Sequence, residues 1–187
     1  MFESILLAGP QSRSIVLQTH LGTDIQNEIA LHPVPEHAQA KFDRLHNQHP
    51  NWQLRKPATG IYNCFGHVWA SRRTAVYDNF DEYVLKVRND DGYRVIDWRG
   101  EESPCPGDVA CYWEQIDPYQ NCFHVGRVVQ LVAQAKLPPA VFVLSKWDDT
   151  AGEVVHQATD YPKSFGNARL EYWTDRPASA PARKVLQ

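Results

Sequence analysis

The stretch PGDVACYWEQIDPYQNCFHVGRVV, residues 106–129, decides the fold. It opens on Pro-Gly, a turn signal, and the Asp-Pro pair at 117–118 divides it into two runs rich in valine, aromatic and alternating residues. Alternation of this kind is typical of strands that bury one face. We therefore predict strands over residues 109–115 and 122–132.

Further runs of the same composition follow, each bounded by Pro, Gly or Asp. They predict strands over 140–147, 152–159 and 168–174. Before residue 106 the pattern is helical: strong helix formers behind Pro35 predict a helix over 36–45, and apolar residues at helical spacing predict a second over 64–77. Helices followed by a meander of strands indicate the α+β class, with N-terminal helices packed on an antiparallel β-sheet.

The remaining segments are less regular. Residues 14–19 are predicted to be extended, residues 23–31 helical and residues 46–57 a loop. The last segment, 177–187, is rich in Pro, Ala and Ser, which is typical of a flexible tail.

The composition favours one compact, soluble domain. Of the 187 residues, 43% are hydrophobic, which is enough for a sizeable core. The net charge of -3 disfavours a nucleic-acid partner, and no apolar run approaches the roughly 20 residues that span a bilayer, so no membrane partner is expected. Residues 1–9 have no basic residue ahead of a long apolar stretch, which predicts no secretory signal. We therefore expect a cytoplasmic protein, or one delivered by a non-classical route.

Cys64 is the first candidate for chemistry. Asn63 is a suitable N-cap for the helix predicted at 64–77, which places Cys64 in the first turn. The positive end of the helix dipole favours a thiolate, so such a cysteine is a better nucleophile near neutral pH. The alternative is that Cys64 is a small buried core residue.

A nucleophilic cysteine also needs a base that takes and returns its proton. His124 and His156 each lie inside a predicted strand, where alternation places them on a core-facing side. His67 lies three residues after Cys64 on the same helix and is the weaker candidate, because it does not face the thiol. Ordinary, partly buried histidines explain the two strand positions equally well.

Three short motifs, in this order, resemble those of the NlpC-type group of papain-like cysteine peptidases and amidases. They are YNCFGHV at 62–68, PGDVACY at 106–112 and HVGRVV at 124–129. The resemblance implies a papain-like catalytic domain over 59–176, preceded by an N-terminal extension with a helix over 1–58.

The resemblance also implies roles for individual residues. Cys64 matches the nucleophile, His124 the base, and His156 the residue that orients the base. The chain departs from the family pattern by an insertion, residues 131–149, between base and orienting residue. Rivals for the orienting role are Ser145 and Gln157.

The implied activity is hydrolysis of an amide or peptide bond through a thioester on Cys64, with a peptidoglycan stem peptide or fragment as the first substrate and no cofactor. The backbone N–H of Cys64, free at the helix start, is expected to bind the oxyanion, with Asn63 as a neighbouring candidate. A phage or secretion-system effector is one setting in which such an enzyme reaches the cell wall without a signal peptide.

Two alternatives remain open. The same nucleophile serves a transacylase, a transglutaminase-like enzyme or a deamidase, which fold analogy does not separate. A non-enzymatic binding module is the other, with cysteines that are core thiols or zinc ligands. The zinc set considered is Cys105, Cys111, Cys122 and His124, whose spacing lacks the usual short knuckle.

Overall fold

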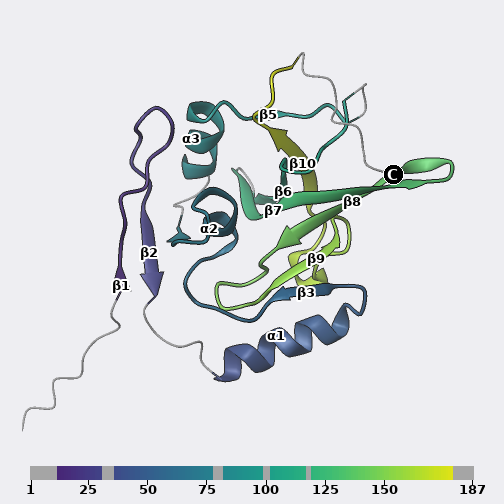
Figure 1. The fold of residues 1–187 in the computed structure, drawn as a ribbon, viewed down its shortest axis with the longest axis horizontal. Coiled ribbons are helices and arrows are strands. Elements are labelled where there is room, and N and C mark those ends of the chain that lie inside the picture. Colours follow the sequence, from purple (N-terminus) through teal and green to yellow (C-terminus); the bar gives the residue numbers. More distant parts are fainter. Residues whose placement is uncertain (1–11, 31–35, 78–81, 99–101, 117–118, 179–187) are drawn as a thin grey trace, which may run out of the picture.

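The computed structural model describes residues 12–30, 36–77, 82–98, 102–116 and 119–178, and it contains one large antiparallel sheet of seven strands (Figure 1). The strands in spatial order are β3 (Gln53–Lys56), β9 (Glu153–Gln157), β8 (Leu137–Ser145), β7 (Tyr119–Gln134), β6 (Val109–Ile116), β10 (Arg169–Thr174) and β5 (Arg94–Val95). The predicted α+β class is confirmed. The five strands predicted from alternation are all present, with shifted ends.

In the described ranges, three α-helices accompany the sheet. They are α1 (Glu36–Gln48), α2 (Cys64–Trp69) and α3 (Glu82–Asp90). A short 3-10 helix, η1 (Lys163–Phe165), precedes β10. The prediction of a helix over 36–45 is confirmed by α1, which buries Ala38 and Phe42 against the sheet.

The helix predicted over 64–77 is wrong beyond Trp69. Ser71 and Arg72 have positive φ angles, 51° and 66°, which end the helix and turn the chain into β4 (Ala75–Val76). The turn brings the Arg72 guanidinium to the buried carboxylate of Glu153, 81 residues later in the chain. The turn that ends the helix is therefore tied to a residue far along the chain.

The helix predicted over 23–31 is also wrong. Residues 27–30 form strand β2 (Asn27–Ala30), which lies between β1 (Ser12–Arg13) and β4 in a small second sheet. The Asn27 side chain accepts a hydrogen bond from the backbone N–H of Ile15 and donates to its carbonyl. Such side-chain bonds to the backbone favour extended structure over a helix.

The loop predicted over 46–57 contains strand β3, which pairs with β9 at one edge of the large sheet. The predicted domain boundary near residue 58 stays a prediction, although β3 lies before it and belongs to this sheet. The predicted tail, 177–187, falls outside the described residues from position 179 onward.

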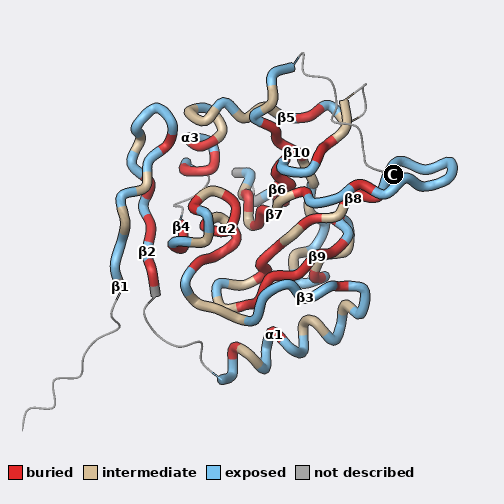
Figure 2. Tube along the Cα trace, viewed as in Figure 1, coloured by how far each residue is buried: buried red, intermediate tan, exposed pale blue. Residues whose placement is uncertain are grey.

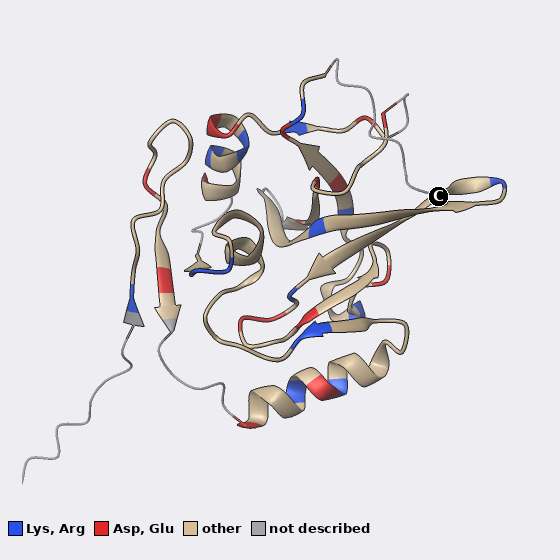
Figure 3. Cartoon of the chain, viewed as in Figure 1, with Lys and Arg blue, Asp and Glu red and all other residues tan. Residues whose placement is uncertain are grey.

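The two faces of the sheet carry two separate cores. On one face, here called the α2 face, Cys111 and Val125 of the sheet pack with Val68 of α2 and Val84 of α3. The opposite α1 face packs Tyr112 and Val128 with residues of α1. Figure 2 shows the buried positions concentrated in the central strands and α2, whereas the hairpin tip that joins β7 to β8 is exposed. Acidic and basic residues are scattered over the elements (Figure 3).

Candidate functional site

The start of α2 is fixed by Asn63, as the sequence predicts. Its Oδ1 accepts hydrogen bonds from the backbone N–H groups of Gly66, at 2.9 Å, and Val76, at 3.0 Å. Its Nδ2 donates to the Val76 carbonyl at 2.5 Å. Both ends of this buried amide therefore hold the helix start against β4, which is a structural role.

Gly66 lets the chain after α2 pass close to the helix. A Cβ at this position would lie 1.8 Å from the carbonyl oxygen of Thr74. Gly126 on β7 is likewise crowded, because a Cβ there would lie 2.5 Å from the Ser145 Oγ. The close neighbours of the two glycines are thus the turn before β4 and strand β8.

The Cys64 thiol is buried at the first position of α2, with 8% of the residue exposed. Burial raises its pKa to about 12, although backbone N–H groups of Val125 and Phe65 point toward the sulfur and oppose that rise. The expectation that the helix dipole favours a thiolate is therefore wrong for this structure: desolvation outweighs the dipole of a six-residue helix.

His124 lies on the α1 face of β7 and is buried. Its ring stacks on Trp147, with centroids 3.7 Å apart and planes at 15°. Burial holds its pKa well below 6.5, and the neighbouring His156 and His67 act in the same direction, so the imidazole is neutral near pH 7. Its Nε2 has no hydrogen-bond partner among the described residues.

Cys64 and His124 meet at one peptide unit. The sulfur lies against the N–H of Val125, which is bonded to the His124 carbonyl carbon. This N–H is available because the pairing of β7 with β8 begins one residue later, at Gly126 and Ser145. Within the described residues no hydrogen bond joins the thiol to the imidazole, whose ring projects to the α1 face.

Trp147 lies between His156 and His124 and contacts both rings. Its Nδ1 lies 2.8 Å from the carbonyl oxygen of Gln157, and its Nε2 accepts the indole N–H of Trp147 at 3.2 Å. These two bonds place the proton of His156 on Nδ1. Burial lowers the pKa of His156 to about 4. The aromatic rings of Trp147 and Tyr112 lie against the His124 ring.

The two rivals of His156 are placed differently. Ser145 is fully buried, and its Oγ has no partner among the described residues. Gln157 is exposed and engages His156 through its backbone carbonyl.

A buried ion-pair network beside α2 is absent from the sequence predictions. Glu153, 1% exposed, accepts hydrogen bonds from the Tyr62 hydroxyl at 2.6 Å and from Arg72 at 2.5 and 3.1 Å. The same guanidinium lies 3.0 Å from Nε2 of His67, whose pKa burial lowers to about 4. The partners come from segments up to 91 residues apart, so no local sequence signal identifies them.

Lys146, the residue after β8, is also buried. Its ammonium donates to the carbonyl oxygens of Thr59, Asp148, Asp149 and Ala151, at 2.6 to 3.0 Å. The Nζ atom also lies 5.4 Å from the ring centre of Tyr62. Lys146 therefore ties the segment after β8 to the segment before α2.

The structure does not support the zinc alternative. Cys111 and Cys122 belong to the core on the α2 face, whereas His124 projects to the α1 face. Nowhere in the described residues do three or more His, Cys, Asp or Glu side chains form a group that could hold a metal ion. All four cysteines are buried, and none of them forms a disulfide.

Two further findings concern the whole chain. None of its described helices has both the length and the apolar character needed to cross a membrane. Comparison with protein-family models, with curated proteins and with solved structures finds no match.

Proposed function

We propose that the protein is a cysteine hydrolase with a papain-like, NlpC-type architecture, which cleaves an amide or peptide bond through a thioester on Cys64. One observation carries the proposal: the Cys64 sulfur lies against the peptide unit that joins His124 to Val125. Two polar groups without a hydrogen-bond partner among the described residues support it. The Nε2 of His124 lacks a partner, and the backbone N–H of Cys64 makes no hydrogen bond to another described residue.

The proposed reaction begins from a neutral pair. Because burial raises the pKa of Cys64 and lowers that of His124, proton transfer accompanies attack instead of preceding it. Sulfur forms a bond to the carbonyl carbon while its proton passes to the imidazole. The carbonyl oxygen becomes an oxyanion and accepts a hydrogen bond from the backbone N–H of Cys64. The C–N bond then breaks, and the imidazolium gives its proton to the leaving amine.

Water completes the cycle. It attacks the thioester, His124 accepts one of its protons, and cleavage of the C–S bond returns the thiol and releases a carboxylic acid. In the resting structure the imidazole is stacked on Trp147 at the α1 face, whereas the thiol packs at the α2 face. The transfer therefore requires β7 to rearrange around residues 124 and 125 as substrate binds. Trp147 is then a positioning residue, since its stacked ring limits the orientations open to the base.

The first substrate to test is a peptidoglycan stem peptide, which the motif resemblance implies. The purified protein is incubated with a stem tetrapeptide, and products are identified by liquid chromatography and mass spectrometry. We expect cleavage by wild type, loss with Cys64→Ala and His124→Asn, and retention with the control Cys105→Ala, since Cys105 lies outside the proposed site. Cleavage that survives Cys64→Ala contradicts the proposal.

An added amine separates hydrolase from transferase. With glycinamide in the reaction, a hydrolase releases mainly the acid, whereas a transacylase or transglutaminase-like enzyme yields the amide adduct. Loss of ammonia without chain cleavage indicates a deamidase.

A binding module with a core cysteine is the second candidate, favoured by the 8% exposure and raised pKa of Cys64. Iodoacetamide alkylation followed by peptide mass spectrometry distinguishes the two. A dyad predicts that His124→Ala slows alkylation of Cys64 and leaves Cys105 unchanged. Equal, slow alkylation of Cys64 in both proteins supports the binding module.

A further inference from the structure

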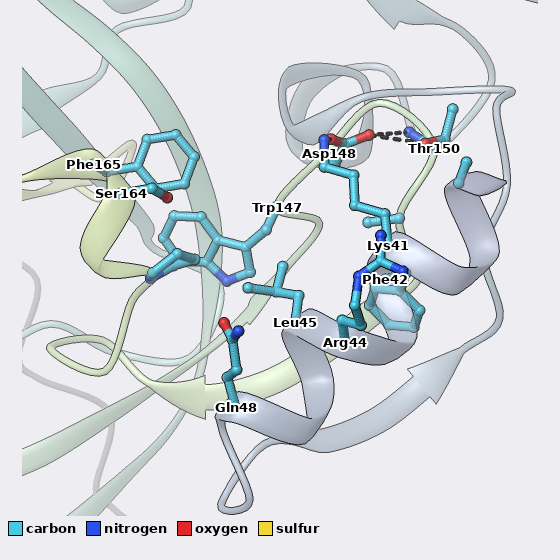
Figure 4. A pocket seen from close by; sticks show the side chains of 13 residues that line it. Lys41, Phe42, Arg44, Leu45, Gln48, Trp147, Asp148, Thr150, Ser164 and Phe165 are labelled. Carbon is cyan, nitrogen blue, oxygen red and sulfur yellow. Dashed lines mark hydrogen bonds and ion pairs between the residues drawn. The ribbon is translucent and has the colours of Figure 1, made fainter.

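A cavity of about 300 Å³ lies on the α1 face, between α1 and the segment that follows β8 (Figure 4). It is separate from the Cys64 thiol, which packs on the α2 face. Its size is at the lower end of the range for small-molecule sites in proteins. The cavity therefore fits a small organic molecule.

The inner wall is apolar and aromatic. Phe42 and Leu45 of α1 face Trp147 and Phe165, and Figure 4 shows the last two rings side by side. The ring centres of Trp147 and Phe165 are 5.6 Å apart. Phe42 and Trp147 are buried, at 4% and 6% exposure, so this wall is held rigidly by the core. A flat apolar group gains contact here without rearrangement of the wall.

The rim carries one unneutralised charge. Lys41 is paired with Asp148, whose carboxylate also accepts hydrogen bonds from the backbone N–H and hydroxyl of Thr150. Arg44, one helical turn away, is exposed and lacks an ion-pair or hydrogen-bond partner within the described part of the chain. The rim is thus positive by one charge, although the whole chain has a net charge of -3.

We propose that this cavity binds a small carboxylic acid with an aromatic or aliphatic body. The apolar body lies between Leu45, Trp147 and Phe165, and the carboxylate pairs with Arg44 at the rim. A cationic ligand is disfavoured, because Asp148, the one acid among the described residues that line the cavity, is already engaged by Lys41. The planar guanidinium matches a carboxylate through two parallel N–H donors.

The site also adjoins the proposed base. Trp147 contacts the cavity with one part of its indole and stacks on His124 with the ring face. An occupant is therefore one aromatic ring away from His124. The binding proposal itself does not depend on the hydrolase activity.

Isothermal titration calorimetry at pH 7 with 4-phenylbutyrate tests the charge. We expect saturable binding to wild type and an affinity about fivefold lower for Arg44→Gln, the effect of one partly exposed charge pair. The matched control is Arg55→Gln, which removes an exposed cation of β3 that does not line the cavity and leaves the affinity unchanged. The neutral 4-phenylbutan-1-ol should bind wild type and Arg44→Gln equally.

Blocking variants test the location. Ser164 is exposed on η1 at the cavity wall, so Ser164→Trp fills the space without removing a core side chain. We expect Ser164→Trp to abolish binding and Ser164→Ala to retain it, with both variants folded by circular dichroism. No saturable binding to wild type at millimolar ligand, equal affinity of Arg44→Gln and wild type, or undiminished binding to Ser164→Trp overturns the proposal. Because Cys64 is untouched, failure of the hydrolase assay leaves this result unaffected.

Discussion

The buried carboxylate of Glu153 offers the sharpest test of how the site is held together. Glu153→Gln keeps the size of the side chain but removes its charge. The amide then turns a donor toward the Arg72 guanidinium or the Tyr62 hydroxyl, where the carboxylate accepts at 2.5 to 3.1 Å. Breaking a fully buried ion pair costs about 3 to 5 kcal/mol. The Arg72 side chain is 34% exposed, and water compensates part of that loss. We therefore expect Glu153→Gln to lower the free energy of unfolding by about 2 kcal/mol.

The loss should depend on pH in a defined direction. Burial raises the pKa of Glu153, but the hydrogen bonds from Arg72 and Tyr62 outweigh it, and the net pKa lies below 4.5. A carboxyl group with a lowered pKa in the folded state contributes its full stabilisation above the unfolded pKa, and loses it as the pH falls through the folded pKa. The difference between wild type and Glu153→Gln is thus largest near pH 7 and shrinks below about pH 4.5.

Urea unfolding followed by circular dichroism at pH 7 and pH 4 measures this difference. Glu82→Gln is the matched control, because Glu82 forms an exposed pair with Lys86 on α3, and its loss should cause no resolvable change. The reasoning is refuted if Glu153→Gln is as stable as wild type at pH 7. It is equally refuted if the loss is the same at both pH values.

Three further predictions concern backbone and buried histidines. Gly66→Ala should lower the free energy of unfolding by about 3 kcal/mol, since its Cβ would lie 1.8 Å from a Thr74 backbone oxygen; a loss under about 1 kcal/mol in urea unfolding contradicts this. Ser71→Gly should stabilise by about 0.5 kcal/mol, because glycine relieves the positive φ of 51° at some entropic cost; a lower melting temperature counts against it. Burial lowers the pKa of His156 from 6.5 to about 4, so the unfolded chain binds a proton that the folded state excludes. His67 and His124 are lowered in the same way, so His156→Gln should remove only about 3 kcal/mol of the stability that wild type loses between pH 6.5 and pH 4. Equal losses in wild type and His156→Gln by urea unfolding would contradict the burial argument.

The parts of the fold that sequence predicts are those set by local patterns. Strands β6 to β10 follow from alternation and turn residues, and α1 follows from its helix formers. The N-cap of α2 follows from Asn63, because a cap is a contact between residues three apart. In each case the determining interaction lies within one segment.

The wrong predictions share a different cause. The turn after α2 is held by a hydrogen bond from Arg72 to Glu153, and β2 is held by hydrogen bonds between Asn27 and the backbone of Ile15. Strand β3 exists because β9 is available to pair with it, 100 residues later. Partners that lie 12 or more residues away override the local propensity of a segment. The residue pattern within the segment itself therefore does not reveal them.

For the candidate site, the order of the three motifs along the chain indicates Cys64 and His124. It does not predict which residues pack around them. Alternation correctly directs His124 into a core, yet it does not say which of two cores, and the ring lies on the opposite face of the sheet from α2. Burial in the folded protein raises the pKa of the Cys64 thiol. The dipole of α2 alone does not predict this rise, because burial depends on the elements that pack around the helix. The buried role of Lys146 depends on four carbonyl groups that folding brings together.

The end of β8 lies between the two residues of the proposed dyad, which project from opposite faces of the sheet. After Ser145 the chain no longer pairs with β7. The next two side chains point to opposite sides of the sheet. Lys146 lies beside Tyr62, near α2, and Trp147 stacks on His124 at the α1 face. This separation exposes the N–H of Val125 to the Cys64 sulfur. A displacement of the segment after β8 therefore changes the thiol environment and the orientation of His124 together. A ligand that packs against Trp147 acts on this same segment, which gives the cavity beside α1 a direct physical connection to the proposed dyad.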